Sequence, residues 1–306
     1  MRTIQWPLII IFAITGCSST PKKTVSEFSE DIEQEFKNVE NSVFEQPYQV
    51  KYDDTSDFYP QESEEKGSVV SDETLDLTRN KETIKAVAKE GPVGEAMSLC
   101  YSNQNDQGFK LLQAQAKFHQ KNPTFYLALG NCYFLQQKYR MALLFYNKAR
   151  EINSNFAPAI NNIGVVHELD GLHQNALSAY AAATKSRPLS STPSFNQAQL
   201  LLRYNLSKLA LPILEKLHQT ENNKIEIILA LASCYILEGR FGEAAVLFER
   251  AKDNFKLPTQ QLLNYAYVMA LTGKKGDAKD ILEEIDPADG NYDQSFYAKL
   301  KQEFGL

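Results

Sequence analysis

A spacing of 34 residues recurs without insertion from residue 123 to residue 290, and this period constrains the fold more than any other feature of the sequence. Two places in each unit hold only small residues. The eighth place is Gly130, Gly164, Ala198, Ala232 and Ala266, and the twentieth is Ala142, Ala176, Ala210, Ala244 and Ala278. The twenty-fourth place is bulky throughout: Tyr146, Tyr180, Leu214, Phe248 and Leu282. Self-similarity at this period is typical of stacked supersecondary units, so we predict a repeat protein.

The spacing of the small residues predicts that each unit is a pair of antiparallel helices. Two helices approach closely only where a side chain is missing on both, and the bulky residue then fills the space toward the next pair. Turn-forming residues stand where such helices would end, as at Gly171, Gly239 and Gly273 near the middle of a unit and Arg187-Pro188 at its end. We therefore predict an all-α fold for this part of the chain.

The period and the residue types resemble the tetratricopeptide repeat (TPR). Five units match by residue type as well as by spacing, namely 123–156, 157–190, 191–224, 225–258 and 259–290. The resemblance implies a right-handed superhelical solenoid. In the third unit, Gln197 takes a core place and Pro212 falls in the second helix, so we expect looser or kinked packing there.

Further helices are expected on both sides of the five units. Residues 79–122 keep the register from residue 91 onward but lack an aromatic core, which predicts a degenerate N-terminal helix pair. Residues 291–306 carry Phe296, Leu300 and Phe304 at helical spacing. Because a stack of helix pairs needs ends that cover its exposed apolar faces, we predict a C-terminal capping helix there.

The N-terminal residues read as a secretion signal. One positive charge at Arg2 precedes an apolar run, Ile4 to Ile14, that is too short to span a bilayer as a mature helix. Ile14-Thr15-Gly16-Cys17 follows and resembles the lipobox of bacterial lipoproteins. The resemblance implies removal of residues 1–16, a diacylglycerol on Cys17 and, because Ser18 is not acidic, anchoring at the outer membrane facing the periplasm.

An acidic stretch, residues 17–78, separates this anchor from the repeats, and its composition predicts a disordered linker. Residues 18–76 hold 16 acids against 5 bases, whereas residues 91–306 hold 20 against 22. Within the linker, residues 25–44 have apolar side chains at spacings of 3 and 4, as on one face of a helix. Two interpretations stay open: the segment docks on a partner or on the chain's own repeats, or it is only a transient helix.

The composition and the motifs exclude several classes of function. A nearly neutral body lacks the excess of Lys and Arg that binds nucleic acid. No nucleophile elbow, phosphate-binding loop or dinucleotide-binding glycine pattern occurs, so we expect neither an enzyme nor a cofactor nor a small-molecule substrate. His167 and His173 stand at packing places, which favours no metal site. We expect Cys100, Cys132 and Cys234 to be buried free thiols, because Cys132 and Cys234 lie three units apart.

In a TPR stack the first helix of each unit lines a concave groove, and the resemblance therefore implies a set of groove residues. They are Leu127, Asn131, Phe134, Asn161, Val165, Phe195, Gln199, Leu202, Ser233, Ile236 and Tyr267. The amides of Asn131 and Asn161 could bind a peptide backbone, which they can both donate to and accept from, or could simply be solvated. Leu202 could equally pack between helices. The groove suits an apolar protein segment.

A lipid-anchored TPR protein without catalytic residues looks like an assembly scaffold. The lipobox, the run Asn161-Asn162-Ile163-Gly164-Val165 and the run from Asn264 to Leu271 are most similar to the TPR lipoprotein of the Tad/Flp (tight adherence) pilus system. This resemblance implies a role in Flp pilus assembly, with the pilus secretin or another pilus component as partner. Two alternatives are a type IV pilus pilotin that assembles the secretin and an adaptor for cell-wall hydrolases or proteases.

Overall fold

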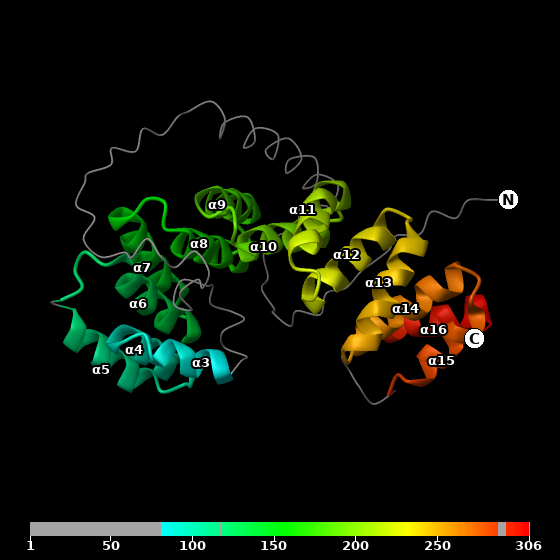
Figure 1. Ribbon diagram of the computed structural model, residues 1–306, viewed down its shortest axis with the longest axis horizontal. Helices are drawn as coiled ribbons and strands as arrows, with labels where there is room; N and C mark the ends of the chain where they lie inside the picture. Colours follow the sequence, from blue (N-terminus) through cyan, green and yellow to red (C-terminus); the bar gives the residue numbers. More distant parts are fainter. Residues whose placement is uncertain (1–80, 117, 287–291, 306) are drawn as a thin grey trace, which may run out of the picture. The chain divides into compact units, whose positions relative to one another are not determined.

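The computed structural model describes residues 81–116, 118–286 and 292–305, and every regular element in them is a helix (Figure 1). This confirms the predicted all-α fold. The predicted signal peptide (1–16), Cys17, the acidic linker (17–78) and the segment 25–44 lie outside the described residues. The helices are α3 (Lys81–Ala88), α4 (Pro92–Tyr101), α5 (Asn105–Gln115), α6 (Pro123–Leu135), α7 (Tyr139–Ile152), α8 (Ala157–Leu169), α9 (His173–Ser186), α10 (Ser191–Arg203), α11 (Ser207–Thr220), α12 (Ile225–Leu237), α13 (Phe241–Asn254), α14 (Thr259–Leu271), α15 (Lys275–Glu283) and α16 (Gln294–Phe304).

The helix bounds follow the period of the sequence. In all five units the first helix covers places one to thirteen, and the second helix begins at place seventeen, after a turn of three residues. Pro212 lies inside α11, which is one continuous element from Ser207 to Thr220. In the range 79–122, α4 and α5 form a helix pair, and α3 precedes it as a short helix that the period did not predict.

The turn inside each pair uses one residue with a positive φ, always at the fifteenth place. This φ is 62° at Asn103, 60° at Gln137, 75° at Gly171, 60° at Asn205, 72° at Gly239 and 84° at Gly273. Because Asn103 takes the same place in the pair before the first unit, α4 and α5 turn as the repeats do. The left-handed conformation suits Gly and Asn but costs other residues about 1–2 kcal/mol. Gln137 is therefore the strained member of the set.

The small residue at the eighth place lies against the bulky residue at the twenty-fourth place. A Cβ atom added to Gly130 would lie 2.3 Å from Cε1 of Tyr146, and one added to Gly164 would lie 2.7 Å from Cε1 of Tyr180. Both tyrosine rings are fully buried. Tyr146 also belongs to a core cluster with Ile163 of α8, so the ring fills space both within its own pair and toward the next one.

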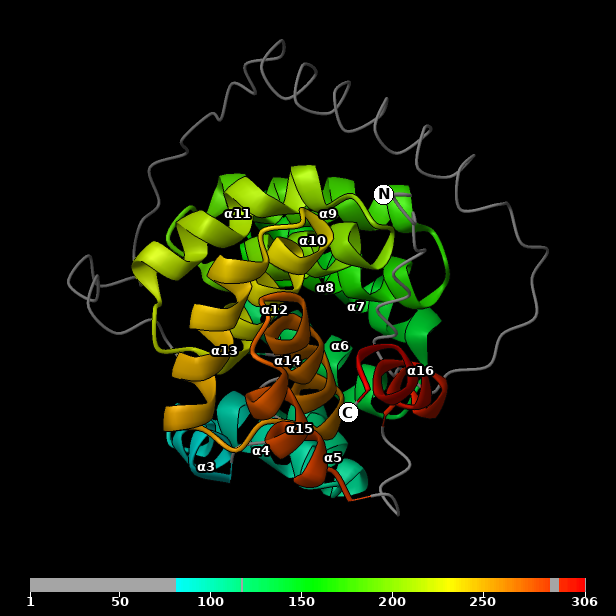
Figure 2. The same ribbon diagram turned by 90° about the vertical axis from the view of Figure 1, so that its right-hand side faces the viewer.

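The described residues divide into two compact units, 81–197 and 198–305, and the boundary in the sequence falls within α10. In the N-terminal unit, α4 packs against α3, α5 and α6 (Figures 1 and 2). In the C-terminal unit, α14 packs against α12, α13, α15 and α16 (Figure 2). The backbone N–H of Asp293 donates to Gln260 Oε1 at 2.8 Å, and Asp293 Oδ1 accepts from the N–H of Phe296 at 2.9 Å, which caps α16.

Cys100 and Cys132 form a disulfide bond, with an Sγ–Sγ distance of 2.05 Å and a Cα–Cα distance of 5.3 Å. The prediction that these two residues are free thiols is wrong. The reason is that α4 and α6 are neighbours, so the relevant pair joins adjacent units, whereas the prediction compared only Cys132 and Cys234. Cys234 is a buried free thiol, as predicted. Its Sγ donates to the carbonyl of Ser207 at 3.4 Å, and burial raises its pKa to about 12.

The turn at Gln137 can be tested by substitution. Gln137→Gly removes the steric cost of the left-handed conformation, and the extra freedom of glycine in the unfolded chain offsets only part of this gain. We expect the free energy of unfolding, measured by urea denaturation, to rise by about 0.5–1 kcal/mol. Gly239→Ala, at the same place in another unit, should lower it by a similar amount. A loss of stability in Gln137→Gly would contradict this explanation.

The disulfide can be tested in a soluble chain with Cys17→Ser. The bond closes a loop with a sequence separation of 32 residues, and a loop of this size stabilises by about 3–4 kcal/mol through the unfolded state. Both reduction and the double substitution Cys100→Ala, Cys132→Ala should therefore lower the free energy of unfolding by this amount. Cys234 should react with a thiol reagent only after denaturation. Unchanged stability on reduction would show that the bond is absent or contributes nothing.

Candidate protein-binding surface

A ladder of buried amides connects the first helices of successive pairs in the N-terminal unit. The Nδ2 group of Asn131 on α6 donates to the hydroxyl of Tyr101 on α4 at 3.1 Å. Its Oδ1 accepts from Tyr146 at 2.9 Å and from Asn162 Nδ2 on α8 at 3.0 Å. Asn161 Nδ2 donates to Asn162 Oδ1 at 3.2 Å. The last step joins α8 to α10, where Asn196 Nδ2 donates to Asn161 Oδ1 at 3.1 Å. We call these residues the asparagine ladder.

The ladder corrects the prediction for Asn131 and Asn161. Both side chains are 1% exposed, and both the oxygen and the nitrogen of each amide are already hydrogen-bonded within the chain. They are therefore neither solvated nor free to bind a peptide backbone. Burial also raises the pKa of the hydroxyls of Tyr101 and Tyr146, so both stay protonated. Buried polar groups of this kind stabilise a fold only when their partners are complete.

The other predicted groove residues divide into two groups by exposure. Buried residues are Leu127, Phe134, Leu202, Ser233 and Ile236, and half-buried residues are Val165, Phe195, Gln199 and Tyr267. Tyr267 on α14 already contacts α16, since its ring centroid lies 5.3 Å from that of Phe296. Partner binding by the half-buried residues stays a prediction.

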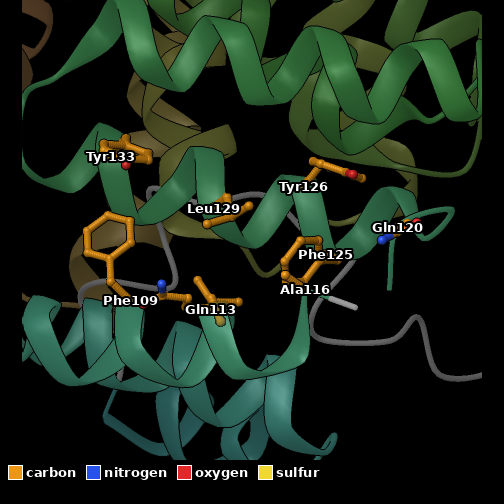
Figure 3. Close-up of a pocket in the computed structure, with 9 residues that line it drawn as sticks. Phe109, Gln113, Ala116, Gln120, Phe125, Tyr126, Leu129 and Tyr133 are labelled. Carbon is orange, nitrogen blue, oxygen red and sulfur yellow. The ribbon is translucent and has the colours of Figure 1, made fainter. Parts of the chain in front are cut away.

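A cleft of about 800 Å³ lies between α5 and α6, and the sequence analysis did not predict it (Figure 3). It is lined by Phe109, Leu112, Gln113, Ala116, Gln120, Phe125, Tyr126, Leu129 and Tyr133. Figure 3 shows Phe109 and Gln113 of α5 pointing toward Tyr133 and Leu129 of α6. The ring centroids of Phe109 and Tyr133 are 4.7 Å apart, so these two rings close one end of the cleft. An apolar cleft of this size with a few amides is typical of a binding site.

The helix pair beside this cleft differs from the pair that follows it. α5 has 11 residues, whereas α7, α9, α11 and α13 each have 14 and α15 has 9. Before α8, Phe156 is buried in the core of the next pair. The same place before α6 is Asn122, whose side chain instead accepts from Thr124 N and caps that helix. Because Ser190, Lys224 and Pro258 take this place in the later units, the sequence pattern does not single out the cleft.

The cleft lining holds two amide side chains and two tyrosine hydroxyls and no charged side chain. Phe118, in the connection between α5 and α6, is 79% exposed, which adds an aromatic side chain near this region. Outside the cleft lining, burial lowers the pKa of His167 on α8 and of His218 on α11. No cluster of His, Cys, Asp and Glu that could hold a metal ion occurs among the described residues. Among the helices of that part of the chain, none is long and apolar enough to cross a membrane.

Residues 123–156 match the family described as tetratricopeptide repeat, which is the first of the five predicted units. No curated protein shows significant similarity to the chain. The match, together with the helix pairs, identifies the architecture as a TPR fold. TPR folds generally serve as non-catalytic scaffolds that bind proteins or peptides.

Solved structures share the fold at low sequence identity. PilF of Pseudomonas aeruginosa has a TM-score of 0.61 and 17% identity, covering 69% of this chain and 97% of that one. PilW, described as a widely conserved type IV pilus biogenesis factor, has a TM-score of 0.57 and 17% identity, covering 68% and 96%. YrrB, described as a TPR protein with an unusual peptide-binding site, has a TM-score of 0.54 and 20% identity, covering 62% and 97%.

The asparagine ladder predicts a large cost for Asn131→Ala. The substitution leaves Tyr101, Tyr146 and Asn162 each without one hydrogen-bond partner in a buried site, and each unsatisfied group costs about 1–3 kcal/mol. We expect the free energy of unfolding, measured by urea denaturation, to fall by about 3 kcal/mol or more. Asn175→Ala, at an exposed position on α9, is the control and should change it by less than about 0.5 kcal/mol. A small effect of Asn131→Ala would mean that water replaces the amide.

Proposed function

We propose that the chain is a non-catalytic, lipid-anchored scaffold that binds a segment of a partner protein during assembly of an envelope machine. The observation that carries this proposal is the aromatic cleft between α5 and α6 within a TPR fold. An extended or helical segment with one or two large apolar side chains would bury them against Phe125, Tyr126 and Leu129. Gln113 and Gln120 would hydrogen-bond to its polar groups.

Two features support export to an oxidising compartment. The lipobox ending at Cys17 would attach the chain to a membrane through acyl chains, each adding roughly 0.8 kcal/mol per buried CH₂. Disulfide bonds such as Cys100–Cys132 persist mainly in exported proteins. We therefore propose that the protein is anchored at the outer membrane and faces the periplasm.

We propose the Tad/Flp pilus system as the machine, with the pilus secretin or another assembly component as the partner. The support is the similarity of the lipobox and of the runs Asn161 to Val165 and Asn264 to Leu271 to the TPR lipoprotein of that system. A type IV pilus pilotin is the second candidate. It is favoured by the fold shared with PilW, which is described as a type IV pilus biogenesis factor.

Site-specific photocrosslinking of the lipidated full-length chain in its host tests the proposal. A photoreactive amino acid at Gln113, inside the cleft, should capture a secretin or another pilus assembly protein. The matched control is the same amino acid at Gln219, an exposed glutamine on α11, which should capture none of it. With Cys17→Ser the chain should leave the outer-membrane fraction, and capture should fall because anchor and partner are no longer on the same membrane.

The identity of the captured protein separates the candidates. A Flp-type secretin or assembly protein supports the Tad/Flp role, and a type IV pilus secretin supports the pilotin role. Capture of a cell-wall hydrolase at Gln113 would contradict both and would favour an adaptor for wall enzymes. Equal capture at Gln113 and Gln219 would show that the cleft is not the binding site.

A further inference from the structure

The cleft between α5 and α6 lies in a basic part of the chain. Residues 105–138, which contain both helices, hold four lysines and a single acid, Asp106. Lys110 follows Phe109 at one end of the cleft, and Lys121 follows Gln120 at the other, and both are exposed. Lys138 Nζ lies 6.0 Å from the ring centroid of Tyr133, which lines the cleft. An occupant with an apolar face and acidic flanks would therefore match this surface in both respects.

The chain itself contains a segment with this chemistry. Residues 25–44 hold six acids and one lysine. Ile32, Phe36, Val39 and Val43 follow one another at spacings of 4, 3 and 4, which places them on one face of a helix. From Ile32 to Val43 such a helix would rise about 16 Å at 1.5 Å per residue. The cleft lining on α6 runs from Phe125 to Tyr133, about 12 Å at the same rise, so the three side chains from Ile32 to Val39, about 10 Å from end to end, match the cleft in extent.

The connection between the segment and the folded body is long enough for docking within one chain. Residues 45–80 separate the segment from α3, and a flexible chain of 36 residues would span roughly 30–36 Å. Both α3 and the two cleft helices pack on α4, so the cleft lies within about two helix diameters, roughly 20 Å, of the start of α3. A linker of this length gives an effective concentration of about a millimolar, at which even a weak contact is populated.

We propose that the cleft between α5 and α6 holds residues 25–44 of the same chain. Ile32, Phe36 and Val39 pack on the aromatic lining, and the acids of the segment face the lysines around it. The partner segment and residues 25–44 compete for the cleft, so binding of a partner releases the acidic segment. This competition rests on the proposed function, whereas occupancy of the cleft by the segment does not.

Hydrogen exchange of the soluble full-length chain, with Cys17→Ser, tests the occupancy. The test variant, Ile32→Ser, Phe36→Ser and Val39→Ser, removes the apolar face and keeps the length and charge of the segment. Backbone amides of α5 and α6 should exchange at least about threefold faster in this variant, because the segment no longer covers the cleft and protects them from solvent. The matched control changes Gln34, Asn38 and Asn41 to Ser in the same segment and should leave exchange unchanged. Equal exchange in all three chains overturns the proposal.

Charge reversal and crosslinking provide two independent tests of the contact between the segment and the cleft. Lys110→Glu with Lys121→Glu should reproduce the faster exchange, whereas the same reversal at Lys208 and Lys256, exposed in the other unit, should not. A photoreactive amino acid at Gln113 in the purified chain should form crosslinks to residues 25–44 within one molecule. Crosslinks that join two copies would overturn the proposal in favour of a dimer contact, and crosslinks outside residues 25–44 would overturn it as well.

The same variant distinguishes the two proposals in cells. If residues 25–44 compete with the partner, the Ile32→Ser, Phe36→Ser, Val39→Ser chain should capture the partner at Gln113 about two- to threefold more efficiently. If exchange is faster but capture of the partner is unchanged, residues 25–44 occupy the cleft without competing with the partner, and the proposed competition is wrong. If no partner is captured by any chain while exchange differs, the proposed function fails and the contact within the chain stands.

Discussion

The fit of a tyrosine ring against a glycine backbone sets the geometry on which the N-terminal unit depends. The ring of Tyr146 occupies the space where a Cβ atom of Gly130 would stand, and the ring of Tyr180 does the same at Gly164. Because no side chain separates the helices there, the hydroxyl of Tyr146 reaches across the pair to Asn131 Oδ1. The close approach within one pair is thus also what positions the first residue of the ladder that joins the pairs.

The asparagine ladder fixes the register of each helix pair against the next. Apolar contacts between helix pairs tolerate small shifts of one pair against the next, since dispersion and burial are not directional. Amide hydrogen bonds are directional, and a buried amide that loses its partner costs about 1–3 kcal/mol. The steps from Tyr101 through Asn131 and Asn162 to Asn196 therefore hold α4, α6, α8 and α10 in one register. This accounts for the burial of three amide side chains, those of Asn131, Asn161 and Asn162.

The fold was predictable because its determinants are local and periodic. Small residues at two places and a turn at a third determine where the helices begin and end. Each unit carries the same residue pattern, so each can be predicted on its own. The predictions that failed concern contacts between units, which depend on the units that are neighbours in space and on the side chains that bury a given residue. Cys132 pairs with Cys100 because α4 and α6 are adjacent, and the spacing of like places in distant units carries no such information. Asn131 faces a groove in the general TPR pattern, but here Tyr101 and Asn162 enclose it from both sides.

The same distinction explains why the cleft arises at the degenerate pair rather than at a regular one. A unit that satisfies every place of the repeat buries its apolar surface against the next unit and leaves little for a ligand. The pair before the first regular unit has a second helix of 11 residues, against 14 in each of the first four regular units. Disulfide-bonded cysteines join this pair to α6 just beside the cleft, so its walls are held together even though its packing is incomplete. Irregularity in one unit, combined with a covalent link to a regular one, thus produces a rigid aromatic surface that remains accessible, which is the physical requirement for selective binding of a segment.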